Sequence, residues 1–188
     1  MGNATRIRKA MAFSISVYLL WVIVTYLLEG RILTLLRPEA AIDRIVYTVI
    51  ANFLLGIIIA AWVLRSSLTS GFVSHEHLGF RSIRHTLLAV VTAGVFGFVL
   101  FIVQNPPSLT PVVIMNVYAQ VLTVSIAEVV VCWGVIGASF ESLARNKGKI
   151  MSPLAGILAA SFSFGIYHFA HSPPFNQVNM VLFLIVVG

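Results

Sequence analysis

One acidic residue, Glu128, stands inside a long apolar segment, within the sequence SIAEVVVCWGV. The chain has six acidic residues, and the other five lie in polar connectors or at the ends of apolar runs. An ionised carboxylate at the centre of a membrane costs roughly a few kcal/mol or more, so it should face the bundle interior and be either protonated or paired. Glu128 is therefore the first candidate for chemistry, or for a neutral carboxyl that hydrogen-bonds between helices.

Two histidines, His168 and His171, are the candidate partners of Glu128, and they lie in the sequence FSFGIYHFAHSPP. Residues three apart share one face of a helix, so both imidazoles can point into one cavity. In one chemistry, the carboxylate takes a proton from water while a histidine polarises a carbonyl group or stabilises the oxyanion. In the other, Glu128 and the histidines hold a divalent metal such as zinc, which acidifies the water. The metal version has less support because no further well-placed ligand is evident, and the cofactor remains open.

The elements that must hold these residues are expected to be membrane helices. The 188-residue chain is 59% hydrophobic and 10% charged, with a mean hydropathy of +0.99, whereas a soluble domain carries about 25% charged residues. The 12 basic residues against 6 acidic ones are compatible with nucleic-acid binding, but they lie between the apolar runs, as the positive-inside rule produces. We therefore expect the lipid bilayer, and not nucleic acid, as a partner.

Apolar runs predict an all-α fold, a polytopic transmembrane helix bundle that forms a single domain over residues 1–188. A spanning helix needs about 20 apolar residues, which gives five complete spans and a partial sixth. The expected spans are 11–28, 45–64, 86–103, 111–140 and 152–170, followed by the partial span 177–188. Because the last run is too short to cross a bilayer, we expect that the natural domain continues past Gly188.

The basic residues divide unequally between the two sides that these spans would create. Nine lie on one side, namely Arg6, Arg8, Lys9, Arg65, Arg81, Arg84, Arg145, Lys147 and Lys149. Three lie on the other side, namely Arg31, Arg37 and Arg44. Basic connectors remain in the cytoplasm. The sequence therefore predicts a multi-pass protein of the cell membrane with a cytoplasmic N-terminus.

Two short motifs resemble those of the CPBP intramembrane proteases, the family of CAAX proteases and bacteriocin-processing (Abi) proteins. The segment EVVVCWG at 128–134 resembles their first motif, Glu-Glu-x-x-x-Arg followed by Gly, and FGIYH at 164–168 matches the second, Phe-x-x-x-His. Val129 and Trp133 stand where the family has its second glutamate and its arginine. The third motif, His-x-x-x-Asn on a later helix, is absent.

The resemblance implies a membrane endopeptidase whose glutamate activates water, aided by histidines, to cleave a peptide bond of a peptide or protein substrate near the membrane. It makes Glu128 the water-activating base and His168 its partner, with His171 as a further candidate. The changes at Val129 and Trp133 leave open a degenerate member without activity. Two other classes also remain open: a transporter that couples Glu128 to protons or ions, and a partner-binding scaffold in which Glu128 joins helices.

Overall fold

The computed structural model describes residues 3–29, 41–78, 82–85 and 122–187, together with scattered positions between 87 and 103. Within these residues every extended regular element is helical. The all-α prediction is therefore confirmed for the part of the chain that the structure describes.

Two long helical stretches each change their hydrogen-bonding pattern partway along. After α1 (Asn3–Leu28), the first stretch is α2 (Ala41–Tyr47), the π-helix η1 (Thr48–Ile59) and α3 (Ala60–Thr69), followed by the turn η2 (His75–Leu78). The second stretch is α6 (Thr123–Glu128), the π-helix η4 (Val129–Gly137) and α7 (Ala138–Leu143). The chain then forms the turn η5 (Arg145–Lys147), α8 (Met151–Tyr167), the turn η6 (His168–Ala170) and α9 (Val178–Val187). Glu128 thus lies where α-helical bonding gives way to wider π-helical bonding, which often marks functional sites.

Four helices of the described residues are long and apolar enough to cross a membrane: Thr5–Leu28, Ile42–Thr69, Thr123–Leu143 and Met151–Ala170. They support a membrane protein, but they are four rather than the five complete spans and partial sixth that the sequence predicted. Most of the predicted span 86–103, and the first part of the predicted span 111–140, lie outside the described residues. The predicted partial span 177–188 contains α9, whose 10 residues reach about 15 Å, half of a hydrocarbon core.

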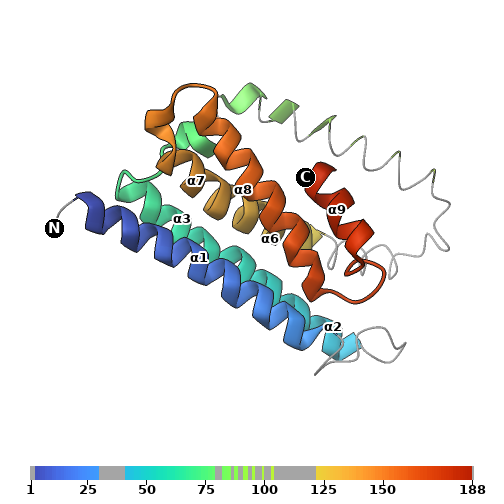
Figure 1. Cartoon of the computed structure of the whole chain (residues 1–188). Coiled ribbons are helices and arrows are strands. Elements are labelled where there is room, and N and C mark those ends of the chain that lie inside the picture. The colour runs from blue at the N-terminus through green and yellow to red at the C-terminus, as the bar shows by residue number, and fades with distance from the viewer. Residues whose placement is uncertain are drawn as a thin grey trace.

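The described helices form a bundle in which α1 packs along η1 and α3, while η4 and α7 lie against α8 (Figure 1). The chain then turns back, and α9 packs on α8. At the centre, the fully buried rings of Trp21 and Tyr167 stack with centroids 3.7 Å apart. This aromatic contact joins α1 to the end of α8, at the residue immediately before His168.

Two hydrogen bonds between helices fix α1 relative to the rest of the bundle. The hydroxyls of Ser14 and Ser139 lie 2.9 Å apart, and the Tyr18 hydroxyl donates to the carbonyl oxygen of Ser163 at 2.8 Å. Such contacts hold helices together in a membrane, where apolar burial does not drive helix association. They fix the position of α1, and with it the acid Glu29 that follows its last turn.

Gly56 allows η1 to approach the helix that carries Glu128. A methyl group added at Gly56 would lie 2.5 Å from the Cβ of Ala127, a distance at which two carbon atoms overlap. Ala127 is fully buried and immediately precedes Glu128. The position of the carboxylate therefore depends on this contact between small residues.

Candidate functional site

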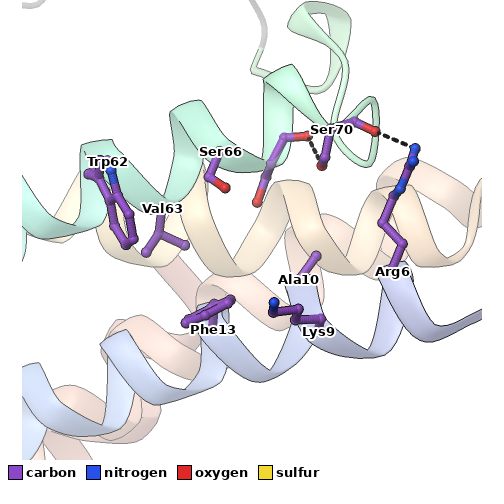
Figure 2. Close-up of a pocket in the computed structure, with 9 residues that line it drawn as sticks. Arg6, Lys9, Ala10, Phe13, Trp62, Val63, Ser66 and Ser70 are labelled. Carbon is purple, nitrogen blue, oxygen red and sulfur yellow. Dashed lines mark hydrogen bonds between the residues drawn. The ribbon is translucent and has the colours of Figure 1, made fainter. Parts of the chain in front are cut away.

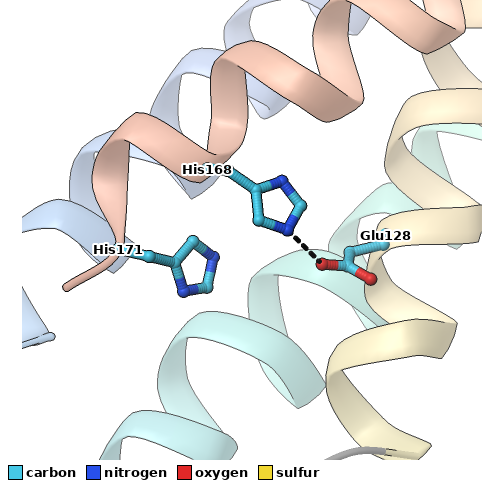
Figure 3. A group of neighbouring side chains, drawn as sticks. All are labelled: Glu128, His168 and His171. Carbon is cyan, nitrogen blue, oxygen red and sulfur yellow. Dashed lines mark ion pairs between the residues drawn. The ribbon is translucent and has the colours of Figure 1, made fainter. Parts of the chain in front are cut away.

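The structure brings together the three residues that the sequence singled out. Glu128 ends α6, whereas His168 and His171 lie at the end of α8, and their side chains point toward one another (Figure 3). His168 Nε2 lies 3.7 Å from Glu128 Oε1, and one ligand atom from each of the three residues lies within 4.8 Å of the other two. Their catalytic role stays a prediction, but their proximity is a property of the fold.

The imidazole of His168 is held by the residue four positions before it. Its Nδ1 lies 2.8 Å from the carbonyl oxygen of Phe164, so Nδ1 carries the proton that makes this hydrogen bond. The ring of Phe164 also meets the imidazole edge-on, with centroids 4.7 Å apart. In neutral His168 the lone pair of Nε2 therefore faces Glu128, which gives the Phe-x-x-x-His spacing a physical basis here.

His171 reaches the site by a different backbone path from the one predicted. The sequence argument placed both histidines on one α-helical face, but α8 ends at Tyr167 and η6 is a 3₁₀ turn. His171 itself is extended, with φ −82° and ψ 176°. Because a 3₁₀ turn has three residues, positions three apart nearly superpose. The two imidazoles consequently stack, with centroids 5.1 Å apart and planes inclined by 24°.

Glu29 is a fourth member of the site, and sequence reasoning missed it. Its Oε2 lies 2.6 Å from Nδ1 of His171, and its Oε1 accepts a hydrogen bond from the backbone N–H of Ser172 at 3.3 Å. A separation of 2.6 Å between nitrogen and oxygen implies a charge-assisted bond with the proton on Nδ1. His171 Nε2, which is buried and has no hydrogen-bond partner among the described residues, is then left to face Glu128 and His168.

The contacts of Glu29 also decide its charge. Burial raises the pKa of this carboxyl group, but the bonds from His171 and from the Ser172 amide lower it further, and the net pKa lies below its usual value. Glu29 is therefore an anion at neutral pH. It can hold His171 in one orientation and one tautomer, as carboxylates do for catalytic and metal-binding histidines.

The two positions that depart from the CPBP motif have apolar roles. Trp133 packs against the ring of Phe164, with centroids 5.2 Å apart, and Val129 is 58% exposed on the outside of its helix. Trp133 thus supports the residue that holds His168. Neither side chain can orient Glu128 by charge, so the carboxylate of Glu29 is the described acid that acts on the site in addition to Glu128.

Three atoms with available lone pairs converge in this site, namely a carboxylate oxygen of Glu128, Nε2 of His168 and Nε2 of His171. A water molecule can donate its two hydrogens to two of them, which leaves its own lone pairs directed outward for attack. A divalent metal can also be held by one carboxylate and two imidazoles, and the outer partners found here, a carboxylate and a backbone carbonyl, are those that metal-binding histidines use. Glu128, His168 and His171 are therefore the residues that would bind such an ion.

Comparison of the chain with protein-family models, with curated proteins and with solved structures finds no match. The function must therefore be argued from the geometry of Glu29, Glu128, His168 and His171.

Proposed function

We propose that this chain is an intramembrane endopeptidase of the CPBP type, in which Glu128 activates a water molecule that attacks a peptide bond. The observation that carries the proposal is the buried pairing of Glu128 with His168, whose Nε2 lies 3.7 Å from the carboxylate. The exposed fractions of the two side chains are 9% for His168 and 15% for Glu128. A site largely closed to bulk water suits hydrolysis, because electrostatic interactions are stronger there.

The proposed reaction uses Glu128 twice, first as a general base and then as a general acid. Glu128 takes one proton from water, while Nε2 of His168 accepts a hydrogen bond from the remaining O–H group and orients the oxygen toward the substrate carbonyl. The new C–O bond forms as the carbonyl becomes an oxyanion, and Glu128 then gives its proton to the leaving amine as the C–N bond breaks. Glu29, at 2.6 Å from Nδ1 of His171, holds that imidazole in place beside His168 and the reacting groups.

The site is proposed to lie toward the outer side of the cell membrane. Lys9 lies in α1 and Glu29 directly follows that helix, 20 residues later, which corresponds to about 30 Å, the thickness of a hydrocarbon core. The basic start of α1 would face the cytoplasm, and Glu29 would then mark the opposite boundary.

The proposal is tested by incubating the purified chain in proteoliposomes with a library of membrane-anchored peptides in ¹⁸O-labelled water. Mass spectrometry then identifies fragments whose new carboxyl terminus contains one labelled oxygen. We expect labelled cleavage by the native chain and a loss of about a thousandfold in Glu128→Gln, since a general base contributes on the order of 10²–10⁴. Glu141→Gln is the matched control, because Glu141 lies in α7 away from the histidines, and it should retain activity.

Three further outcomes are informative. Cleavage that persists in Glu128→Gln would overturn the proposed role of Glu128. Loss of cleavage on chelation, with recovery on adding zinc, would make Glu128 a metal ligand and the metal-bound water the nucleophile. Absence of cleavage, together with a proton flux in the same vesicles that requires Glu128, would assign the site to ion coupling instead.

A further inference from the structure

A second polar site lies at the other end of α1, between α1 and α3 (Figure 2). It is a pocket of about 200 Å³. The residues that matter to its chemistry are Arg6, Lys9 and Phe13 from α1, Trp62 and Ser66 from α3, and Ser70 directly after α3. Below it is called the α1–α3 pocket.

The charge of the α1–α3 pocket is positive. Arg6 donates from Nη1 to the backbone carbonyl oxygen of Ser70 at 3.2 Å, which holds the guanidinium across the mouth and leaves its other N–H groups available. Lys9 is exposed, three residues further along α1, and forms no ion pair with a residue that the structure describes. Among the residues that the structure describes, no acidic side chain lines the pocket. Two cations held three residues apart on one helix face are suited to bind one anionic group.

The neutral polar groups of the α1–α3 pocket are hydroxyls and carbonyls at the end of α3. Ser66 exposes its hydroxyl toward the pocket, whereas Ser70 donates its hydroxyl proton to the carbonyl of Ser67 at 2.9 Å. The partial negative charge of the carbonyl groups at the end of α3 disfavours a bound anion, but one of these carbonyls accepts a hydrogen bond from Arg6. The positive end of the α1 helix dipole, in its first turns, favours negative charge. The balance of charge in the pocket therefore rests on Arg6 and Lys9.

The α1–α3 pocket continues into an exposed aromatic surface. Phe13 lies one turn after Lys9, and Trp62 lies one turn before Ser66; their exposed fractions are 47% and 62%. Both rings are about 6 Å deeper along the helices than the polar groups. Tryptophan side chains favour this depth, at the boundary between headgroups and acyl chains. A phosphate bound by Arg6 and Lys9 would thus place an attached glycerol and its acyl chains beside the two rings.

We propose that the α1–α3 pocket binds the phosphate group of an anionic phospholipid, with Arg6 and Lys9 as its cationic contacts and Phe13 and Trp62 beside the acyl chains. Basic pockets between membrane helices on the cytoplasmic side bind such headgroups. The adjacent aromatic surface favours a phospholipid over a soluble phosphate, which would leave both rings without a contact. The site is separate from Glu128 and does not depend on the proposed protease function.

The experiment is native mass spectrometry of the chain in a neutral detergent, titrated with phosphatidylglycerol or with phosphatidylcholine that has the same acyl chains. The test variant is Arg6→Gln with Lys9→Gln. The matched control is Arg8→Gln with Arg65→Gln, which removes the same charge from exposed positions of the same two helices outside the pocket. Neutral micelles are used because a charged membrane surface would attract every basic residue alike.

We expect the native chain to prefer phosphatidylglycerol by about tenfold or more, and the test variant to lose about tenfold in affinity. The control should stay within about twofold. Equal losses in both variants, or equal binding of the two lipids, would overturn the proposal. Displacement of phosphatidylglycerol by an equal concentration of glycerol 3-phosphate would show a site for a soluble anion instead.

A folding defect is excluded by comparing the thermal unfolding of the two double variants in the same detergent. If Arg6→Gln proves unstable because the bond to Ser70 is lost, Lys9→Gln alone serves as the test. The proposal then requires this single variant to bind phosphatidylglycerol more weakly than Arg8→Gln does.

Discussion

The two ends of α1 carry charge in opposite ways. At its start, Arg6 and Lys9 are exposed, and Arg6 donates a hydrogen bond to the backbone carbonyl oxygen of Ser70. Beyond its last turn, the Glu29 carboxylate lies 2.6 Å from Nδ1 of His171 and accepts a hydrogen bond from the backbone N–H of Ser172 at 3.3 Å. Exposed charges near water need no protein partner and are available to bind lipid. A side chain inside the bundle stays ionised only when other helices or turns supply an opposite charge or hydrogen bonds.

This difference explains why one end is a candidate for chemistry and the other for anchoring. The buried end assembles groups from three parts of the chain, namely Glu29 after α1, Glu128 in α6 and the histidines after α8. The exposed end presents side chains whose positions only two neighbouring helices define. Substitutions at the two ends should therefore affect different measurements.

The largest expected contrast is between Glu128→Gln and Arg8→Gln. The first removes the proposed base without changing side-chain volume and should lower peptide cleavage by about a thousandfold. The second removes one exposed charge from the start of α1 and should leave cleavage unchanged. Initial rates in proteoliposomes measure both, and similar losses in the two variants would remove the contrast.

Glu29→Gln should have a smaller effect on catalysis, about tenfold in kcat with little change in KM. The amide cannot stabilise the proton on His171 as the carboxylate does, and outer partners of this kind contribute on the order of 10–100-fold. The pH–rate profile should also shift, which a purely structural role would not produce. Asp43→Asn, at the same end of the bundle, is the control, and an identical profile in Glu29→Gln and the native chain would contradict the positioning role.

Gly56→Ala should destabilise the fold by about 1–3 kcal/mol, because its new methyl group overlaps Ala127 Cβ. The free energy of unfolding in mixed detergent micelles measures the effect. Gly134→Ala is the matched control. Its methyl group would meet Leu64 Cδ2 at 3.3 Å, and that flexible side chain can move. Equal effects of the two changes would show that close approach next to Glu128 is not required.

The pH dependence of the unfolding temperature should show the contribution of Glu29, at the buried end of α1, to stability. The pKa of Glu29 in the folded chain lies below its ordinary value of 4.5. Its contribution to stability is therefore complete above about pH 4.5 and is lost as the pH falls through the lowered pKa. The unfolding temperature of Glu29→Gln should accordingly fall less than that of the native chain between pH 7 and about pH 3. Parallel curves would contradict this assignment.

Sequence reasoning located the helices and the central residues because both follow local rules. Apolar runs of spanning length gave the membrane helices, and Phe164 with His168 formed a recognisable five-residue pattern. Glu128 was conspicuous because charge is costly inside an apolar helix. These features depend on neighbouring residues and can be found without a structure.

The features that were missed depend on distant contacts. Glu29 ends an apolar run in the sequence and resembles an ordinary boundary charge, yet its partner His171 lies 142 positions later. The 3₁₀ turn at His168 had no sequence signal that separated it from a further turn of α8. The one available indication of Glu29 was its place at the same predicted membrane boundary as His171.

The central claim is that Glu128 and His168 act on one water molecule, and a double-mutant cycle tests it most directly. Cleavage rates are measured for Glu128→Gln, His168→Ala and the double variant in the same proteoliposomes. Residues that hold one water lose their function together, so the double variant should be within about threefold of the slower single variant. Losses that multiply would show that the two residues act independently, and would contradict the account.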